Sequence, residues 1–90
     1  MKRAHIRVVG LVRGVGFRSY ARNYAKELAL KGFVKNLNDG SVEIVVEGYE
    51  KQMSTFLQVL RKGPWGAKVE DLQIEWEDPT NEFNDFEVKS

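Results

Sequence analysis

The sequence predicts an α+β fold in which one antiparallel sheet carries two helices on one face. Two observations support this prediction. First, segments with alternating apolar and polar residues surround two segments in which apolar residues recur every three or four positions. Second, the segments follow the order strand, helix, strand, strand, helix, strand, with a short fifth strand at the end, which is the split βαβ arrangement. We expect one domain over residues 1–90, because a chain of this length builds a single core.

The first half of the chain supplies a strand, a helix and a second strand. Residues 5–12 alternate in character and are rich in β-branched side chains, which favours a strand. Apolar residues at three-to-four spacing from Phe17 to about Lys31 predict an amphipathic helix. We expect Gly32 to end this helix, because glycine commonly follows a helix C-terminus. Residues 33–37 are then the second strand.

The second half begins with a hairpin. Residues 38–40 read Asn-Asp-Gly, which is typical of a tight turn, and the third strand over 41–47 follows it. Apolar spacing from Tyr49 to Leu60 predicts a second helix, which Gly63 and Pro64 end. The fourth strand covers 69–77, and a short fifth strand carries Phe86 and Val88. We interpret the two tryptophans, Trp65 and Trp76, as structural anchors.

Composition excludes several kinds of site. The chain has no cysteine and one histidine, so it has neither a disulfide framework nor the nitrogen and sulfur ligands of a zinc centre. We therefore expect no metal and no cofactor, and a reducing, cytoplasmic location. The apolar run at residues 8–12 is too short to cross a membrane or to form a signal-peptide core.

Charge is divided unevenly along the chain. Residues 1–38 hold nine basic groups and one acid, for a charge of +8, whereas residues 39–90 hold five basic and twelve acidic groups, for −7. An anionic ligand would be attracted to the first part. The alternative is that the basic groups form an ordinary solvated face.

The loop between the first strand and the first helix is suited to bind a phosphate. Gly14 and Gly16 can adopt left-handed backbone angles, so successive amides of residues 13–17 can point at one anion. The following helix adds its free N–H groups and the positive end of its dipole. Arg18 stands at the helix start, where its guanidinium can hold phosphate oxygens in a bidentate manner. The alternative is a glycine-rich turn beside a surface arginine.

Two sequence blocks resemble the acylphosphatase family. Residues 10–18 read Gly-Leu-Val-Arg-Gly-Val-Gly-Phe-Arg, close to the family motif Gly-x-Val-Gln-Gly-Val-x-Phe-Arg. Residues 32–36 read Gly-Phe-Val-Lys-Asn, and residues 40–42 continue as Gly-Ser-Val, which is similar to the second family block. Arg13 stands where the family usually has glutamine. Its backbone N–H can serve the loop equally well.

The resemblance implies a ferredoxin-like sandwich that hydrolyses carboxyl phosphates to a carboxylate and inorganic phosphate without a metal. It implies that Arg18 binds the phosphate, that Asn36 orients the attacking water, and that the loop of Arg13, Gly14, Val15, Gly16 and Phe17 cradles the phosphate. We further expect a monomer that binds an acyl phosphate but neither nucleic acid nor membrane. Met1 and an end soon after the fifth strand lead us to expect a free-standing protein.

The main alternative is a ferredoxin-like binding module without catalysis. One form is an RNA-binding domain, and residues 31–34 do resemble the start of an RNA-binding block. That block belongs on the third strand, where this chain has no aromatic residue on which a base could stack. The other form is a regulatory or maturation domain that binds acyl or carbamoyl phosphates within a larger assembly.

Overall fold

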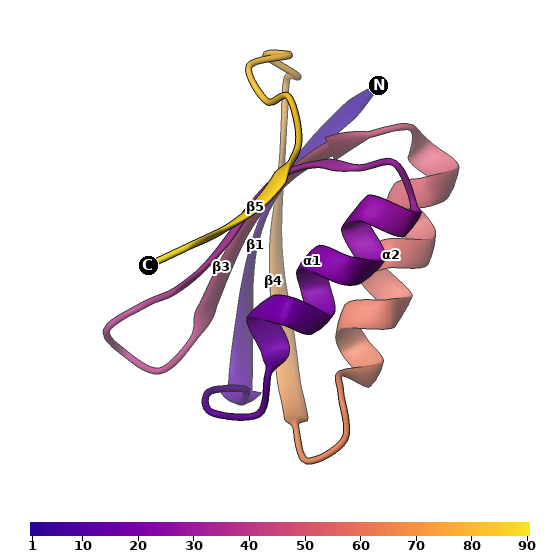
Figure 1. The fold of residues 1–90 in the computed structure, drawn as a ribbon. Coiled ribbons are helices and arrows are strands. Elements are labelled where there is room, and N and C mark those ends of the chain that lie inside the picture. The colour runs from indigo at the N-terminus through magenta and orange to yellow at the C-terminus, as the bar shows by residue number, and fades with distance from the viewer.

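The computed structural model describes residues 1–90 and contains the predicted elements in the predicted order (Figure 1). Both helices pack on one face of a five-stranded sheet whose strand order is β4-β1-β3-β2-β5. The elements are β1 (Lys2–Leu11), α1 (Phe17–Glu27), β2 (Lys31–Asn36), β3 (Val42–Gly48), α2 (Glu50–Lys62), β4 (Lys68–Glu77) and β5 (Phe86–Lys89). The ferredoxin-like prediction is confirmed. Neither helix has the length and apolar character needed to cross a bilayer.

The sheet differs from the prediction at its fifth strand. Strands β4, β1, β3 and β2 are antiparallel neighbours, as expected, but β5 pairs with β2 in parallel. The chain leaves β4 at one edge, crosses the end of the sheet through residues 78–85 and enters beside β2 from the end at which β2 begins (Figure 1). This crossing brings the end of β5 next to the end of β2.

The core lies between the sheet and the two helices. Alternate strand residues face the helices, and those of β1 (Ala4, Ile6, Val8) and β3 (Val42, Ile44, Val46) are completely buried. Helix α2 contributes Phe56, whose ring meets that of Phe86 edge-on at 6.1 Å. Burying each large apolar side chain stabilises the fold by about 1.5–3 kcal/mol. This packing fixes the start of α1 beside the end of β2.

Helix α1 ends earlier than the spacing predicted. Its C-cap is Leu28, and Ala29 follows in a left-handed conformation with φ 57°. The N–H of Ala29 donates to the carbonyl of Lys26 at 3.1 Å, and the N–H of Leu30 donates to that of Ala25 at 2.8 Å. This is the Schellman arrangement, which usually has glycine at the left-handed position.

Gly32 therefore does not end the helix, contrary to the prediction. It lies inside β2 with φ 147°, and a Cβ on it would come within 1.8 Å of the carbonyl oxygen of Val45. Real Cβ atoms do not approach a backbone atom so closely. Glycine is required here because β2 and β3 approach each other too closely for a side chain.

The two tryptophans are not buried anchors, contrary to the interpretation of the sequence. Trp65 lies in the turn after α2 and is 99% exposed. Trp76 is 54% exposed, because β4 is an edge strand whose helix-facing side is only partly covered. The ammonium group of Lys2 lies 5.6 Å from the centre of the Trp76 ring.

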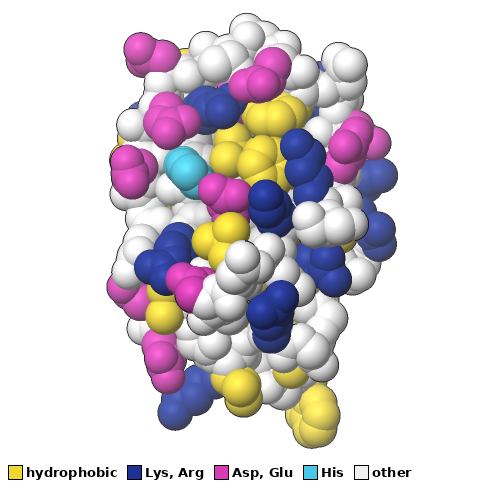
Figure 2. Space-filling view, turned by 90° about the vertical axis from the view of Figure 1, so that its left-hand side faces the viewer, with side chains coloured by type: hydrophobic (Ala, Val, Ile, Leu, Met, Phe, Trp, Pro, Cys, Tyr) yellow, Lys and Arg dark blue, Asp and Glu magenta, His cyan; other side chains and the backbone are white.

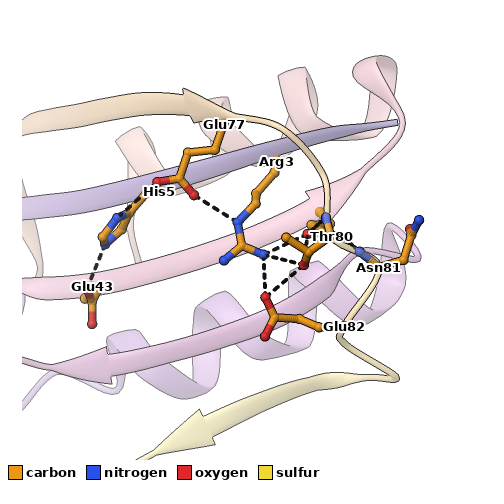
Figure 3. A network of polar contacts seen from close by, with 8 residues as sticks. Arg3, His5, Glu43, Glu77, Thr80, Asn81 and Glu82 are labelled. Atoms are coloured by element: carbon orange, nitrogen blue, oxygen red, sulfur yellow. Dashed lines mark hydrogen bonds and ion pairs between the residues drawn. The ribbon is translucent and has the colours of Figure 1, made fainter.

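The other face of the sheet carries charged side chains of both signs around a small apolar patch (Figure 2). On it, Arg3 donates from Nη1 to Glu47 at 2.8 Å and from Nε to Glu77 at 2.9 Å (Figure 3). The backbone N–H groups of Thr80 and Asn81 also donate to Glu47. Burial alone would raise the pKa of Glu47, but these hydrogen bonds together hold its pKa below the usual value. The network fastens the segment after β4 across the sheet.

Candidate functional site

A cavity of about 520 Å³ lies where the β1–α1 loop, the end of β2 and the end of the chain come together. Figure 1 shows the loop and the β2–β3 hairpin at the same end of the molecule. Seven residues line the cavity, and only one is hydrophobic: Arg13, Arg18, Lys35, Asn36, Leu37, Asn38 and Ser90. The structure thus brings together Arg13 and Arg18, which sequence reasoning selected in one motif, and Asn36, which it selected in another.

The loop before α1 presents unpaired backbone donors. Gly14 and Gly16 both have left-handed angles, with φ 73° and 74°, as their positions in the sequence predicted. None of the N–H groups of residues 13–19 donates a well-formed hydrogen bond to another group of the protein. The first such bond runs from the N–H of Tyr20 to the carbonyl of Gly16 at 3.0 Å. Free amides at a helix N-terminus are suited to bind an anion.

Arg18 is the second residue of α1 and is half-buried. Its Nη1 donates to the backbone carbonyl of Lys89 in β5 at 3.2 Å. No carboxylate lies within 4.0 Å of its guanidinium, so its charge is not neutralised by an ion pair. The parallel addition of β5 thus provides the neutral acceptor that holds this side chain at the cavity.

Asn36 is the last residue of β2, where it pairs with Val42 of β3. Its carboxamide makes no hydrogen bond within the protein, so both its acceptor and its donor are free. A free carboxamide can accept from one water proton and donate to a second acceptor. Asn36 can therefore orient a water molecule, although it cannot remove a proton from it.

The remaining residues of the predicted loop do not contribute side chains to the cavity. Phe17 is 2% exposed and belongs to the core, and Val15 packs against the core. Neither these two residues nor Gly14 and Gly16 line the cavity, so of the predicted loop only Arg13 lines it. His5 lies away from the cavity, on the open face of the sheet, where its Nε2 is 2.7 Å from Glu43 (Figure 3).

Sequence reasoning missed four lining residues. Lys35, Leu37 and Asn38 flank Asn36 along the chain, and that proximity was a usable signal. Ser90 gave no signal, because it reaches the cavity only through the parallel pairing of β5 with β2.

The cavity is electropositive. Arg13, Arg18 and Lys35 line it, no acidic side chain does, and none of the three cations forms an ion pair. Such a concentration of unpaired cations attracts an anion. No group of three or more His, Cys, Asp or Glu side chains is placed to hold a metal ion. Electrostatic stabilisation at this site would come from the arginines, the lysine and the amides.

Known proteins resemble this chain over nearly its whole length. The acylphosphatase family model matches residues 4–88. The chain is 43% identical over 88 residues to an acylphosphatase of Roseiflexus sp., covering 98% of this chain and 95% of that one. It is 45% identical over 89 residues to an acylphosphatase of Thermotoga maritima, covering 99% and 98% of the two chains.

Solved structures give a similar result. The crystal structure of acylphosphatase from Bacillus subtilis superposes with a TM-score of 0.97 at 33% identity, covering all of both chains. The crystal structure of T. kodakarensis HypF matches with a TM-score of 0.86 at 40% identity, covering all of this chain but 12% of that one.

Proposed function

This chain belongs to the acylphosphatase family, a family of hydrolases that act on the mixed anhydride of a carboxylic acid and phosphoric acid, and from its site we propose how it carries out that reaction. In this proposal the free amides of residues 13–19 and the guanidinium of Arg18 bind the phosphate group, and Asn36 orients the water. The observation that carries the proposal is that Arg18 and Asn36 line one cavity to which no acidic side chain contributes, and which the loop with the free amides reaches through Arg13.

The proposed reaction is an in-line displacement at phosphorus. The water oxygen held by Asn36 attacks the phosphorus atom, and the bond from phosphorus to the acyl oxygen breaks. The leaving group is a carboxylate whose conjugate acid has a pKa of about 4, so it leaves without being protonated. The water proton passes to a phosphate oxygen, whose second pKa is about 6. The products are a carboxylate and inorganic phosphate.

Catalysis in this scheme is mainly electrostatic. Phosphoryl transfer passes through a loose transition state whose charge is spread over the equatorial oxygens. The guanidinium of Arg18 and the loop amides stabilise that charge, with Arg13 and Lys35 adding to the positive field. We therefore propose that hydrolysis is independent of metal, because fixed cations do what magnesium does in other phosphoryl-transfer enzymes.

The proposal also covers the oligomeric state, the location and the ligands of the protein. We propose a single-domain monomer in the cytoplasm that binds acyl phosphates and does not bind nucleic acid. The absence of cysteine is compatible with a reducing compartment. On the open face of the sheet, Phe33 is covered by Phe83 and by the ammonium group of Lys89, 4.3 Å from its ring centre, so it offers no free stacking platform. The comparisons give no support to a non-catalytic binding module.

Hydrolysis of benzoyl phosphate and acetyl phosphate in the presence of a chelator tests the proposal. We expect the parent protein to stay active, and Arg18→Ala and Asn36→Ala each to lose about 10²–10³ in turnover, the scale of a lost transition-state donor. Arg22→Ala is the matched control, because Arg22 lies on the same helix but does not line the cavity. Unchanged turnover in both site variants would refute the assigned roles. Loss of parent activity with the chelator would refute metal independence.

A further inference from the structure

The carboxamide of Asn36 must be aimed by something other than its own hydrogen bonds, because it makes none within the protein. Its backbone sits in the last pair of β2 with β3, opposite Val42, immediately before the turn. The N–H of Leu37 donates to the carbonyl of Ser41 at 2.9 Å, and the N–H of Gly40 donates to the carbonyl of Leu37 at 3.2 Å. Asn36 is therefore followed directly by a turn that these backbone hydrogen bonds hold.

One side chain, Asp39, ties the turn together. Its Oδ1 accepts from the backbone N–H of Ser41 at 2.9 Å and from the Ser41 hydroxyl at 2.5 Å. Its Oδ2 accepts from Nη2 of Arg7, in β1, which lies between β4 and β3 in the sheet. Nε of Arg7 also donates to the Ser41 hydroxyl at 3.1 Å. The turn is thus anchored to a strand that lies outside the β2–β3 hairpin.

We propose that Arg7 and Asp39 are positioning residues for hydrolysis, which act through Asn36 by fixing the turn that follows it. This inference rests on the proposed function of the site. Neither residue lines the cavity that holds Arg18 and Asn36, so neither is placed to touch the substrate there. Their effect on the reaction must pass through the turn, whose residues Leu37 and Asn38 do line that cavity.

The contacts favour a local role over a general contribution to stability. The side chains of Arg7 and Asp39 are 43% and 49% exposed, and ion pairs at such positions contribute little to global stability. The hydrogen bonds from Ser41, together with Arg7, lower the pKa of Asp39 to about 2, so the pair stays charged at neutral pH. What the pair does supply is a fixed geometry for a short segment.

The same sheet offers a matched control. Arg3, on the same strand as Arg7 and the same face, forms a network near the other end of β1 with the buried Glu47 and with the more exposed Glu77 and Glu82 (Figure 3). Glu82→Gln removes the charge of an exposed carboxylate that pairs with an arginine, as Asp39→Asn does, but at a place remote from Asn36.

A double-mutant cycle on turnover tests the inference. We expect Asp39→Ala and Asp39→Asn to lower turnover of benzoyl phosphate by about 10-fold or more, since small misplacements of a positioning group are costly. Inhibition by inorganic phosphate should change less than about twofold, because Arg18 and the loop amides lie on other elements. Asp39→Ala added to Asn36→Ala should cause no further loss, because both variants remove the same function. Glu82→Gln should keep parental turnover.

Hydrogen exchange gives a readout separate from activity. Asp39→Ala should speed exchange at the amides of Leu37 and Gly40 while leaving that of the central strands unchanged. A full additional loss in the Asn36→Ala background, a parallel loss of phosphate inhibition, or an equal loss in Glu82→Gln would overturn the inference. If Asn36→Ala itself had parental turnover, the proposed function would fail first. If only the Asp39 variants had parental turnover, this inference alone would fail.

Discussion

Replacing Gly16 with alanine tests the geometry of the loop before α1, which we propose binds the phosphate. Gly16 is the N-cap of α1, with φ 74° and ψ 23°. A Cβ added there would meet no atom within 4 Å, so the substitution introduces no steric overlap. The perturbation is therefore almost purely conformational: an L-residue is forced into the left-handed region at the centre of the proposed anion site.

The size of the effect follows from that geometry. The left-handed conformation costs an L-residue about 1–2 kcal/mol. The stiffer unfolded chain offsets about 0.4–1 kcal/mol of this cost. We expect Gly16→Ala to lower the free energy of unfolding by about 1 kcal/mol, which corresponds to a fall in Tm of roughly 4–8 °C for a domain of this size. Gly16→Asn should lose less, since asparagine enters the left-handed region more readily.

Urea unfolding and inhibition by inorganic phosphate measure the two consequences. Gly66→Ala is the control, because Gly66 also has a positive φ, 89°, and a Cβ there would make only an ordinary contact, 3.8 Å from Val15. Both alanine variants should lose similar stability. Only Gly16→Ala should weaken phosphate inhibition, because relief of the strain turns loop amides away from the anion.

Two results would refute this reasoning. A stability loss above about 3 kcal/mol in Gly16→Ala would mean that the side chain meets a contact absent from the structure. Unchanged phosphate inhibition in a variant that has lost the expected stability would mean that the loop amides do not bind the anion.

Acid and salt test two other features. Because Glu47 has a lowered pKa in the folded protein, it stabilises the fold above its unfolded value of 4.5, and this contribution is lost as the pH falls through the folded pKa. Urea unfolding between about pH 5 and pH 3 should therefore show a flatter decline for Glu47→Gln than for the parent, and equal slopes would contradict this. Arg13→Gln removes one of three cavity cations, so kcat/KM should fall about 3–10-fold at low ionic strength and less at high ionic strength. An equal kcat/KM at every ionic strength would show that the Arg13 side chain does not attract the substrate.

The order of elements could be predicted because each element has a local pattern. Val42, Ile44 and Val46 alternate in the sequence and are all completely buried in the structure. The end of α1 could not be predicted, because Ala29 occupies the left-handed position that follows the helix. Alanine, unlike glycine, does not indicate a left-handed conformation. Gly32 led to a wrong prediction because glycine commonly follows a helix, whereas its role here is to permit the close approach of β2 and β3, which the local sequence does not reveal.

The residues of the candidate site could be predicted to the extent that they belong to contiguous motifs. Arg18 and the loop before it form one motif, and Asn36 is the last residue of a second motif. Each motif could therefore be selected from the sequence without knowledge of the other. The acceptor on Lys89 and the lining residue Ser90 could not, because both depend on the parallel pairing of β5 with β2. The contact of Arg7 with Asp39 likewise joins residues 32 positions apart, through the sheet register.

Equilibrium binding of inorganic phosphate, measured by calorimetry on the parent, Arg18→Ala and Asn36→Ala, tests whether Arg18 binds the phosphate and Asn36 acts only on the water. We predict that Arg18→Ala loses phosphate binding together with turnover. Asn36→Ala should keep phosphate affinity within about twofold while turnover falls by about 10² or more, because that residue acts on the water alone. Parental phosphate affinity in Arg18→Ala, or a joint loss of affinity and turnover in Asn36→Ala, would contradict these roles.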